Sequence, residues 1–347
     1  MNTLFTPDKP FKTYQEMVAY LQDFHHLACL DPAWDASVLQ LVPYYDLING
    51  YKELFMSGDK FKPGISFEYL YFFHAFDHSL QNILFEFSVI IENYFKNNLA
   101  HVISRDFGVD VGDYLSYKNY RSSRGGVRFD DIFSKIAAIY QKTPSHSIDE
   151  PTRHYVLHHN HVPPWILMKN VTFSNSINLF SLMKSPQKEA VSDLLVSASI
   201  PAHEKTQLIY YILTLIRKFR NVIAHNLKFI SFDVKKYSRA INMKSLKRFA
   251  PNELLTWRDL HRQIGVYDVY GYIVLSLSFL PNSLEKMSLV QNLISFLDNY
   301  VSENQLHKSI FQNYCGFTGI PQDIILRLKS YVVSITPKVP LPSVRIV

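Results

Sequence analysis

Three side chains that can act together on a phosphodiester stand close together in the string RNVIAH, residues 220–225. Arg220 carries a planar charged fork that binds phosphate oxygens, and His225 is suited to proton transfer near neutral pH. Asn221 precedes His225 by one helical turn, so on a helix the two share a face. The trio could promote attack of a ribose 2′-hydroxyl on the adjacent phosphate, a reaction that needs no metal.

This chemistry requires a helix that holds the trio, and residues 205–230 have the pattern of one. Apolar residues recur there at three- and four-residue steps, at Ile209, Ile212, Ile216, Phe219 and Ile223. The same Arg–His spacing also occurs at Arg153 and His158, in a proline-flanked stretch for which we expect a loop. The helical context therefore favours Arg220 and His225 over the second pair.

Glu92 is a candidate for a supporting residue. It interrupts the apolar pattern of residues 66–104, the longest periodic segment, which predicts one long helix or two adjoining ones. A carboxylate beside a core face is costly to bury unless it is paired, and Arg220 would be a suitable partner. Exposure of Glu92 to solvent is the equal alternative.

Basic residues surround the candidate trio. The chain has a net charge of +6, and residues 217–248 contain ten Lys or Arg against one acidic residue, Asp233. Such a surface suits a polyphosphate such as RNA, although it could also be a solvated face. The residues that we expect to contact RNA are Arg217, Lys218, Lys228, Lys235, Lys236, Arg121 and Arg124.

No metal site or cofactor is expected. A histidine-rich tract spans residues 143–165, but it coincides with prolines and lacks the cysteines or regular spacing of zinc sites. The Gly pair at 125–126 lacks the spacing of a phosphate-binding loop. Two cysteines are too few for a disulfide scaffold and fit a reducing compartment.

Composition favours a helical protein. The 347 residues are 47% hydrophobic and include 11 Gly, which favours helices over turn-rich β structure. Further helices are expected at 13–28, 129–142 and 252–262, the last capped by Asn252. The longest apolar runs fall short of the ~20 residues of a membrane span, and no leader is visible, so we expect a cytoplasmic protein without membrane contact.

In its motifs the chain resembles the HEPN-domain ribonucleases, whose signature is an Arg and a His separated by four to six residues. It resembles more specifically the Abi-like family of bacterial abortive-infection proteins, the AbiD and AbiF group. The matching segments are YYDLINGYKELF (44–55), FEYLYFFHAFDHSL (67–80), VIIENYFKNNLAHVIS (89–104), HVPPWILMKNVTF (161–173) and CGFTGIPQDI (315–324).

The resemblance implies an all-α fold, a HEPN-type helical bundle with additional N- and C-terminal helices, and metal-independent RNA cleavage. It implies that Arg220 and His225 are catalytic, with Asn221 and Glu92 beside them. Since HEPN sites are usually made by two facing motifs, it implies a homodimer. It also implies RNA as a partner, both as substrate and as a small regulatory antitoxin RNA.

The chain departs from the family pattern at Asp46, at Phe173–Ser174 and at Gln322–Asp323, away from the Arg–His pair. A Tyr two residues after His225, typical of toxins controlled by nucleotidyl transfer, is absent. The expected organisation is a lead-in over 1–40, a HEPN-like domain over 41–250 and a helical extension over 251–347. The alternative function is RNA binding without cleavage.

Overall fold

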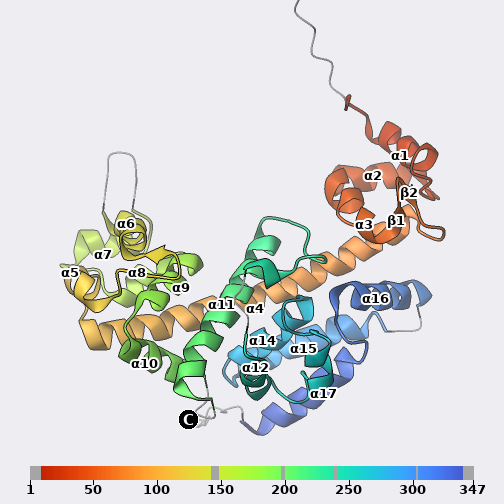
Figure 1. The fold of residues 1–347 in the computed structure, drawn as a ribbon. Coiled ribbons are helices and arrows are strands. Elements are labelled where there is room, and N and C mark those ends of the chain that lie inside the picture. The colour runs from red at the N-terminus through yellow and green to blue at the C-terminus, as the bar shows by residue number, and fades with distance from the viewer. Residues whose placement is uncertain (1–8, 142–147, 197–199, 238–240, 302–303, 339–347) are drawn as a thin grey trace, which may run out of the picture. The chain divides into compact units, whose positions relative to one another are not determined.

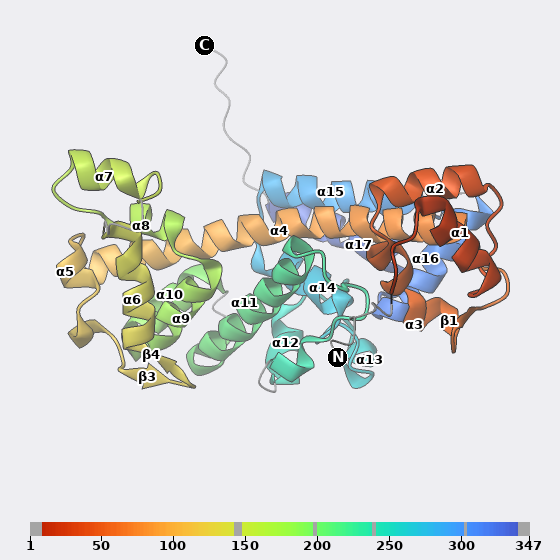
Figure 2. The ribbon, with the colours of Figure 1, turned by 90° about the horizontal axis from the view of Figure 1, so that it is seen from above.

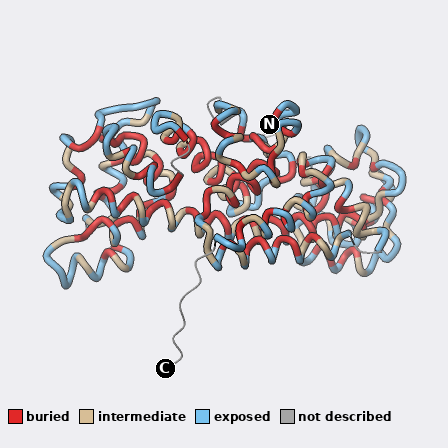
Figure 3. Tube along the Cα trace, turned by 90° about the horizontal axis from the view of Figure 1, so that it is seen from below, coloured by how far each residue is buried: buried red, intermediate tan, exposed pale blue. Residues whose placement is uncertain are grey.

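A computed structural model describes residues 9–141, 148–196, 200–237, 241–301 and 304–338, apart from the side chains of 236 and 237. Across these ranges the fold is all-α, which confirms the predicted class, and strands occur only as two short hairpins (Figure 1). In Figure 3, buried residues recur along the helices with exposed residues between them. Most of these helices therefore contribute one face to a core, whereas α14 (Val269–Phe279) is buried on nearly all sides.

The chain forms two compact units. The first contains the described residues up to Gln81 together with Asn299–Phe317. The second contains the described residues from Asn82 to Asp298 and those from Thr318 onward. The long helix α4 (Phe67–Phe107) begins in the first unit and ends in the second. The periodic segment 66–104 thus contains one helix, which begins at Phe67, rather than two.

The first unit is built on the start of α4. Its other elements are α1 (Tyr14–Asp23), α2 (Pro32–Leu41), the π-helix η1 (Tyr45–Asn49), α3 (Lys52–Phe55), the antiparallel pair β1 (Met56–Ser57) and β2 (Lys60–Phe61), and α16 (Gln305–Thr318). Local signals explain two of the starts. Thr13 and Glu16 form a capping box at α1, and the Asp31 carboxylate accepts backbone N–H bonds at α2.

A buried carboxylate ties this unit together. Asp77 on α4 accepts hydrogen bonds from the hydroxyls of Tyr51, at 2.8 Å, and Tyr314, at 2.7 Å. Burial raises the pKa of Asp77, while both hydroxyl donors oppose that rise. The network joins segments that are distant in sequence and satisfies a polar group that would otherwise be costly to bury.

The second unit holds the candidate trio. Its elements are the remainder of α4, α5 (Val111–Tyr114), η2 (Tyr117–Asn119), β3 (Ser123–Arg124), β4 (Val127–Arg128), α6 (Phe129–Tyr140), α7 (Thr152–His158), α8 (Pro164–Asn170), α9 (Phe173–Leu182), α10 (Ser185–Leu195), α11 (Ala202–Ala224), η3 (Val234–Tyr237), α12 (Met243–Phe249), α13 (Trp257–His261), α14 (Val269–Phe279), α15 (Leu284–Asp298), α17 (Ile324–Ile335) and η4 (Thr336–Lys338). Helix α11 packs against α9, α10, α12 and α14. Figure 1 shows α11 crossing α4, and in Figure 2 one end of α11 comes close to α4 while the other points away from it.

Helix α14 anchors α11 to α4. The ring of Tyr272 stacks on Phe219 of α11, with centroids 5.0 Å apart and planes 4° apart. The Tyr272 hydroxyl also donates a 2.7 Å hydrogen bond to the backbone oxygen of Leu84 on α4. All three residues belong to the second unit, and this contact sets how the C-terminal half of α11 lies against α4.

Two local predictions need correction. The stretch expected to be a loop is helical at α7, because Thr152–His158 satisfies its backbone groups as two short turns between prolines. The predicted helix 252–262 begins only at Trp257, where Thr256 and Asp259 form a capping box, so Asn252 is not its cap. At α13 the capping box is the stronger start signal and sets the helix start five residues after Asn252.

Candidate functional site

The candidate site is built on a helix whose apolar face is confirmed as core. Ile209, Ile212, Ile216 and Phe219 are fully buried in α11, and Ile223 is half-buried. On the other side, Asn221 is half-buried and His225 is exposed. The packed face therefore fixes which way the polar residues of RNVIAH point.

The helix ends at the trio in a Schellman motif. Ala224 is the last helical residue and His225 is the C-cap, with its N–H bonded to the Asn221 oxygen at 3.1 Å. Asn226 takes a left-handed conformation with φ of 49°, and the Leu227 N–H donates to the Val222 oxygen at 2.9 Å. His225 thus sits on an ordered turn while its side chain reaches solvent.

Arg220 lies half-buried between α11 and α4. Its Nη2 is 3.8 Å from Oε2 of Glu92, and its guanidinium carbon lies 5.7 Å from the centre of the Phe85 ring. Its Nη1 donates a long hydrogen bond of 3.4 Å to the Asn221 side chain. The buried Nε has no hydrogen-bond partner within the described ranges. This guanidinium is positioned from two sides yet keeps donors to offer.

Glu92 has a second partner, Lys96, that was not among the predicted site residues. Lys96 lies one turn later on α4 and its Nζ is 2.6 Å from Oε1 of Glu92. The Glu92 side chain is 14% exposed, so the carboxylate is held between two cations rather than turned to solvent. The Glu–Lys spacing of four residues was the available signal for Lys96.

Together these residues could perform acid–base chemistry on a phosphodiester. The structure brings Arg220, Asn221 and Glu92 together, and it puts His225 one turn beyond Asn221 on the same helix end. A guanidinium can bind the phosphate oxygens, and an accessible imidazole can accept or donate a proton. The Glu92 carboxylate orients the guanidinium.

The expected RNA-contacting residues are distributed over two places. Arg217 turns inward, with Nη1 3.2 Å from the Ser174 hydroxyl, and burial lowers its pKa. Burial likewise lowers the pKa of Lys218. Lys228 is half-buried and Lys235 is exposed, whereas the side chain of Lys236 lies outside the described residues.

Arg121 and Arg124 lie apart from the α11 terminus, on the segment that forms the β3–β4 hairpin. Both are exposed. They are neighbours of Lys188 on α10. Burial lowers the pKa of Lys188, and the positive charges of Arg124 and Arg121 lower it further. The predicted RNA-contacting residues thus lie on two segments of the second unit, and their contact with RNA stays a prediction.

The competing Arg153–His158 pair differs from the candidate pair in its surroundings, not in its secondary structure. Arg153 is 59% exposed and pairs with Glu150 at 3.4 Å. Both Arg153 and His158 are exposed on the short helix α7. Arg220, by contrast, is held against a half-buried carboxylate and an aromatic ring.

Within the described residues, no group of three or more His, Cys, Asp or Glu side chains is arranged to hold a metal ion. His154, His158, His159 and His161 of the histidine-rich tract fall within that search, while His146 lies outside the described residues. The tract thus offers no metal centre among the side chains that can be placed.

The sequence that contains this site matches a family model. The family model, described as Abi-like protein, matches residues 37–231, which is more than half of the chain. The matched range includes Glu92, Arg220 and His225. The chain belongs to the Abi-like family. No curated protein and no solved structure gives a significant match.

Membership of the Abi-like family associates the chain with abortive-infection defence. The resemblance found in the sequence segments is thereby confirmed at the level of the family. Among the described residues of this Abi-like chain, no helix is both long enough and apolar enough to cross a membrane.

Proposed function

We propose that this Abi-like chain is a HEPN-type endoribonuclease toxin of a phage-defence system. The observation that carries the proposal is the position of Arg220 on α11, held by Glu92 and Asn221 beside the His225 cap. Arg220 would bind the scissile phosphate and stabilise its developing charge. His225 would take part in the proton transfers as the 2′-hydroxyl loses its proton and attacks phosphorus. The bond from phosphorus to the 5′-oxygen would break, which leaves a 2′,3′-cyclic phosphate and a reprotonated 5′-hydroxyl, and no metal would be required.

Substitution of either catalytic residue tests the proposal. Arg220→Ala and His225→Ala should each abolish cleavage of labelled RNA and toxicity in growing cells, while circular dichroism stays that of the parent. The chain supplies a matched control of the same spacing: Arg153→Ala and His158→Ala should cleave like the parent. Parent-like cleavage by the first two variants would refute the assignment.

A chelator separates this mechanism from metal-dependent cleavage. The proposed chemistry uses side chains alone, so cleavage should be unchanged by EDTA in metal-free buffer. Complete loss of cleavage in EDTA, with restoration by Mg²⁺, would contradict the metal-independent mechanism.

A homodimer is part of the proposal, because HEPN-type sites are composite and a two-fold interface sets identical helices against each other. Light scattering should give the mass of two chains. Specific activity should fall on dilution through the dimer dissociation range. A monomer with concentration-independent specific activity would refute the composite site.

The second candidate function is RNA binding without turnover in the same cytoplasmic setting. The ten Lys and Arg of residues 217–248 favour it. Tight, salt-sensitive binding of RNA that stays intact would support this function over cleavage. Sequencing RNA that copurifies from the native host would test the proposed antitoxin RNA.

The domain organisation remains a prediction linked to this function. Residues 41–250 would act as the RNA-cleaving domain, with 1–40 and 251–347 as helical additions. Limited proteolysis of the complete chain, followed by an RNA-cleavage assay of the purified fragments, tests these boundaries.

A further inference from the structure

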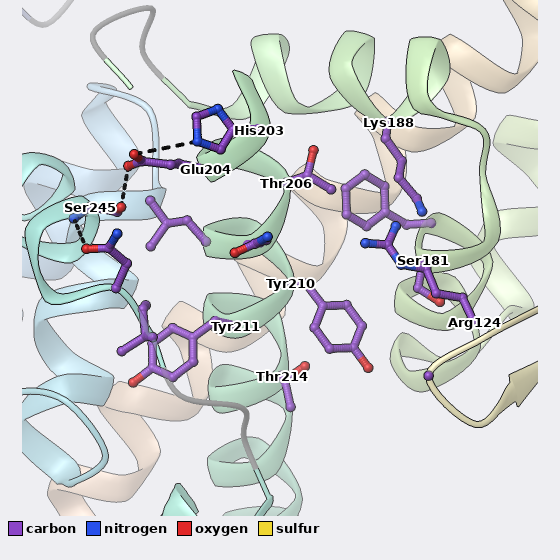
Figure 4. A pocket seen from close by; sticks show the side chains of 16 residues that line it. Arg124, Ser181, Lys188, His203, Glu204, Thr206, Tyr210, Tyr211, Thr214 and Ser245 are labelled. Carbon is purple, nitrogen blue, oxygen red and sulfur yellow. Dashed lines mark hydrogen bonds and ion pairs between the residues drawn. The ribbon is translucent and has the colours of Figure 1, made fainter. Parts of the chain in front are cut away.

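The second unit contains a cavity of about 520 Å³ that the sequence did not indicate. It lies along the N-terminal half of α11, and α9, α10, α12 and the β3–β4 hairpin supply the rest of its lining (Figure 4). Pockets of about 300–1,000 Å³ commonly hold small organic ligands. The cavity therefore has room for a mononucleotide.

Lys188 on α10 lines this cavity with a buried ammonium group. The residue is 3% exposed, and its Nζ has no hydrogen-bond partner in the part of the chain that the structure describes. Burial lowers its pKa to about 8, and Arg124 and Arg121 add to the effect. A buried cation without a partner is costly, so a site that keeps one calls for an anion.

Arg124 reaches the cavity from the β3–β4 hairpin. Gly125 and Gly126 join β3 to β4 with φ of 58° and 84°, positive at both turn positions as a type I′ turn requires. The Arg121 N–H donates a 2.8 Å bond to the Leu182 oxygen, which fastens the start of the hairpin to α9. The hairpin thus delivers Arg124 to a defined place.

The two cations converge on the same space. In Figure 4 the ammonium of Lys188 and the guanidinium of Arg124 point toward one another beside Ser181. Glu204 is the one carboxylate among the described lining residues, and it accepts a hydrogen bond from Ser245 and pairs with Arg248 at 3.6 Å. Its charge is already engaged, so the converging cations are left for a ligand.

The rest of the lining suits a planar polar ring. Tyr210 projects from α11 toward the side where Arg124 and Ser181 lie (Figure 4). Phe180 and Gln207 also line the cavity. Aromatic faces stack on bases, and an amide can pair with a base edge. A phosphate at the cations would leave an attached nucleoside among these groups.

We propose that this cavity binds a nucleotide through its terminal phosphate, with Lys188 and Arg124 on the phosphate and Tyr210 beside the base. The ligand has two possible sources, a free nucleoside 5′-monophosphate or the 5′-phosphorylated end of an RNA. The site is separate from Arg220 and His225 and does not rest on the proposed ribonuclease activity. Tyr210 and Arg220 share α11, about 15 Å apart along its axis at ~1.5 Å per residue.

Isothermal titration of the full chain with each of the four nucleoside 5′-monophosphates, and with the matching nucleosides, tests the site. At least one monophosphate should bind, and its nucleoside should bind at least tenfold more weakly. Lys188→Met and Arg124→Gln should each weaken the monophosphate at least tenfold. Lys135→Met, at an exposed lysine of α6, should bind like the parent. Equal binding by parent and both cavity variants, or binding of no monophosphate, would overturn the proposal.

The stability of Lys188→Met gives an independent readout. In phosphate-free buffer this variant should melt at a higher temperature than the parent, because it removes an unpaired buried charge without a large change of volume. The same concentration of monophosphate should raise the melting temperature of the parent more than that of the variant. A lower melting temperature for the variant would show that Lys188 already has a stabilising role and would count against an anion site.

RNA oligonucleotides with a 5′-phosphate or a 5′-hydroxyl distinguish the two sources. Binding is measured in the Arg220→Ala background, with the RNA checked for integrity afterwards. Tighter binding of the 5′-phosphorylated strand that depends on Lys188 identifies an RNA end as the ligand. Monophosphate binding without a 5′-phosphate preference identifies a free nucleotide. Because binding is scored, failure of Arg220→Ala to block cleavage would refute the ribonuclease assignment and not this site.

Discussion

Arg220 on α11 and Glu92 on α4 are brought within 3.8 Å of each other, although they are far apart in the sequence. Lys96 shares the same carboxylate at 2.6 Å. The Glu92 carboxylate is therefore shared by two cations, and Lys96 is the closer of the two. Arg220 is left aligned but incompletely neutralised, which suits a residue that must also bind a phosphate.

Glu92→Gln should loosen Arg220 and lower RNA cleavage at least tenfold. It should also cost about 1–2 kcal/mol of unfolding free energy, because it breaks charged contacts that are half-buried. Chemical denaturation and a cleavage assay measure the two effects. Glu86→Gln, at an exposed position of the same helix, is the matched control and should change neither.

Asn226→Ala should destabilise the protein by about 1 kcal/mol, because Asn tolerates the left-handed conformation that ends α11 better than Ala does. Asn226→Gly keeps that conformation and should be close to the parent in stability. If the turn positions His225 for catalysis, cleavage should fall more in the Ala variant than in the Gly variant. Equal cleavage by both would show that the turn is not needed for the reaction.

Phe219→Ala should cost about 3–5 kcal/mol, since it empties a fully buried site against Tyr272. Tyr272→Phe keeps the ring and loses only the hydrogen bond to Leu84, so about 1 kcal/mol is expected. Urea unfolding of both variants measures this order. A larger loss for Tyr272→Phe than for Phe219→Ala would contradict the stacking as the main link between α11 and α14.

Protonation of Asp35 should make the first unit more stable as the pH falls from 7 to 5. The residue is completely buried, and burial raises its pKa from 3.8 to about 6. Between those values the folded state binds more protons than the unfolded state, so stability is lost as pH rises through about 6. Melting temperatures across pH 5–7.5 should show this slope.

Asp35→Asn should flatten that slope and raise the melting temperature at pH 7.5. Asp23→Asn, at an exposed carboxylate in the same unit, should keep the slope of the parent. A slope that survives in Asp35→Asn would assign the pH dependence to another group.

Much of the fold was predictable because helical periodicity is local. The apolar positions of residues 205–230 identified the buried face of α11, and four of the five named positions are fully buried. The prediction of a loop at 152–158 was wrong, because the prolines that flank this segment indicate a loop but leave room for a short helix between them. The predicted cap at Asn252 was wrong because the Thr256–Asp259 box is the stronger start signal.

The sequence by itself determined the helix face, the Arg220–Asn221–His225 string and the family segments, since each depends on spacing along one stretch of chain. It left Glu92 equally open to solvent or to Arg220, because side-chain pairing between helices depends on how they cross. Only the tertiary structure decided that pairing, turned Arg217 inward to Ser174 and assembled the cavity around Lys188. These features join residues through space, and no local period encodes them.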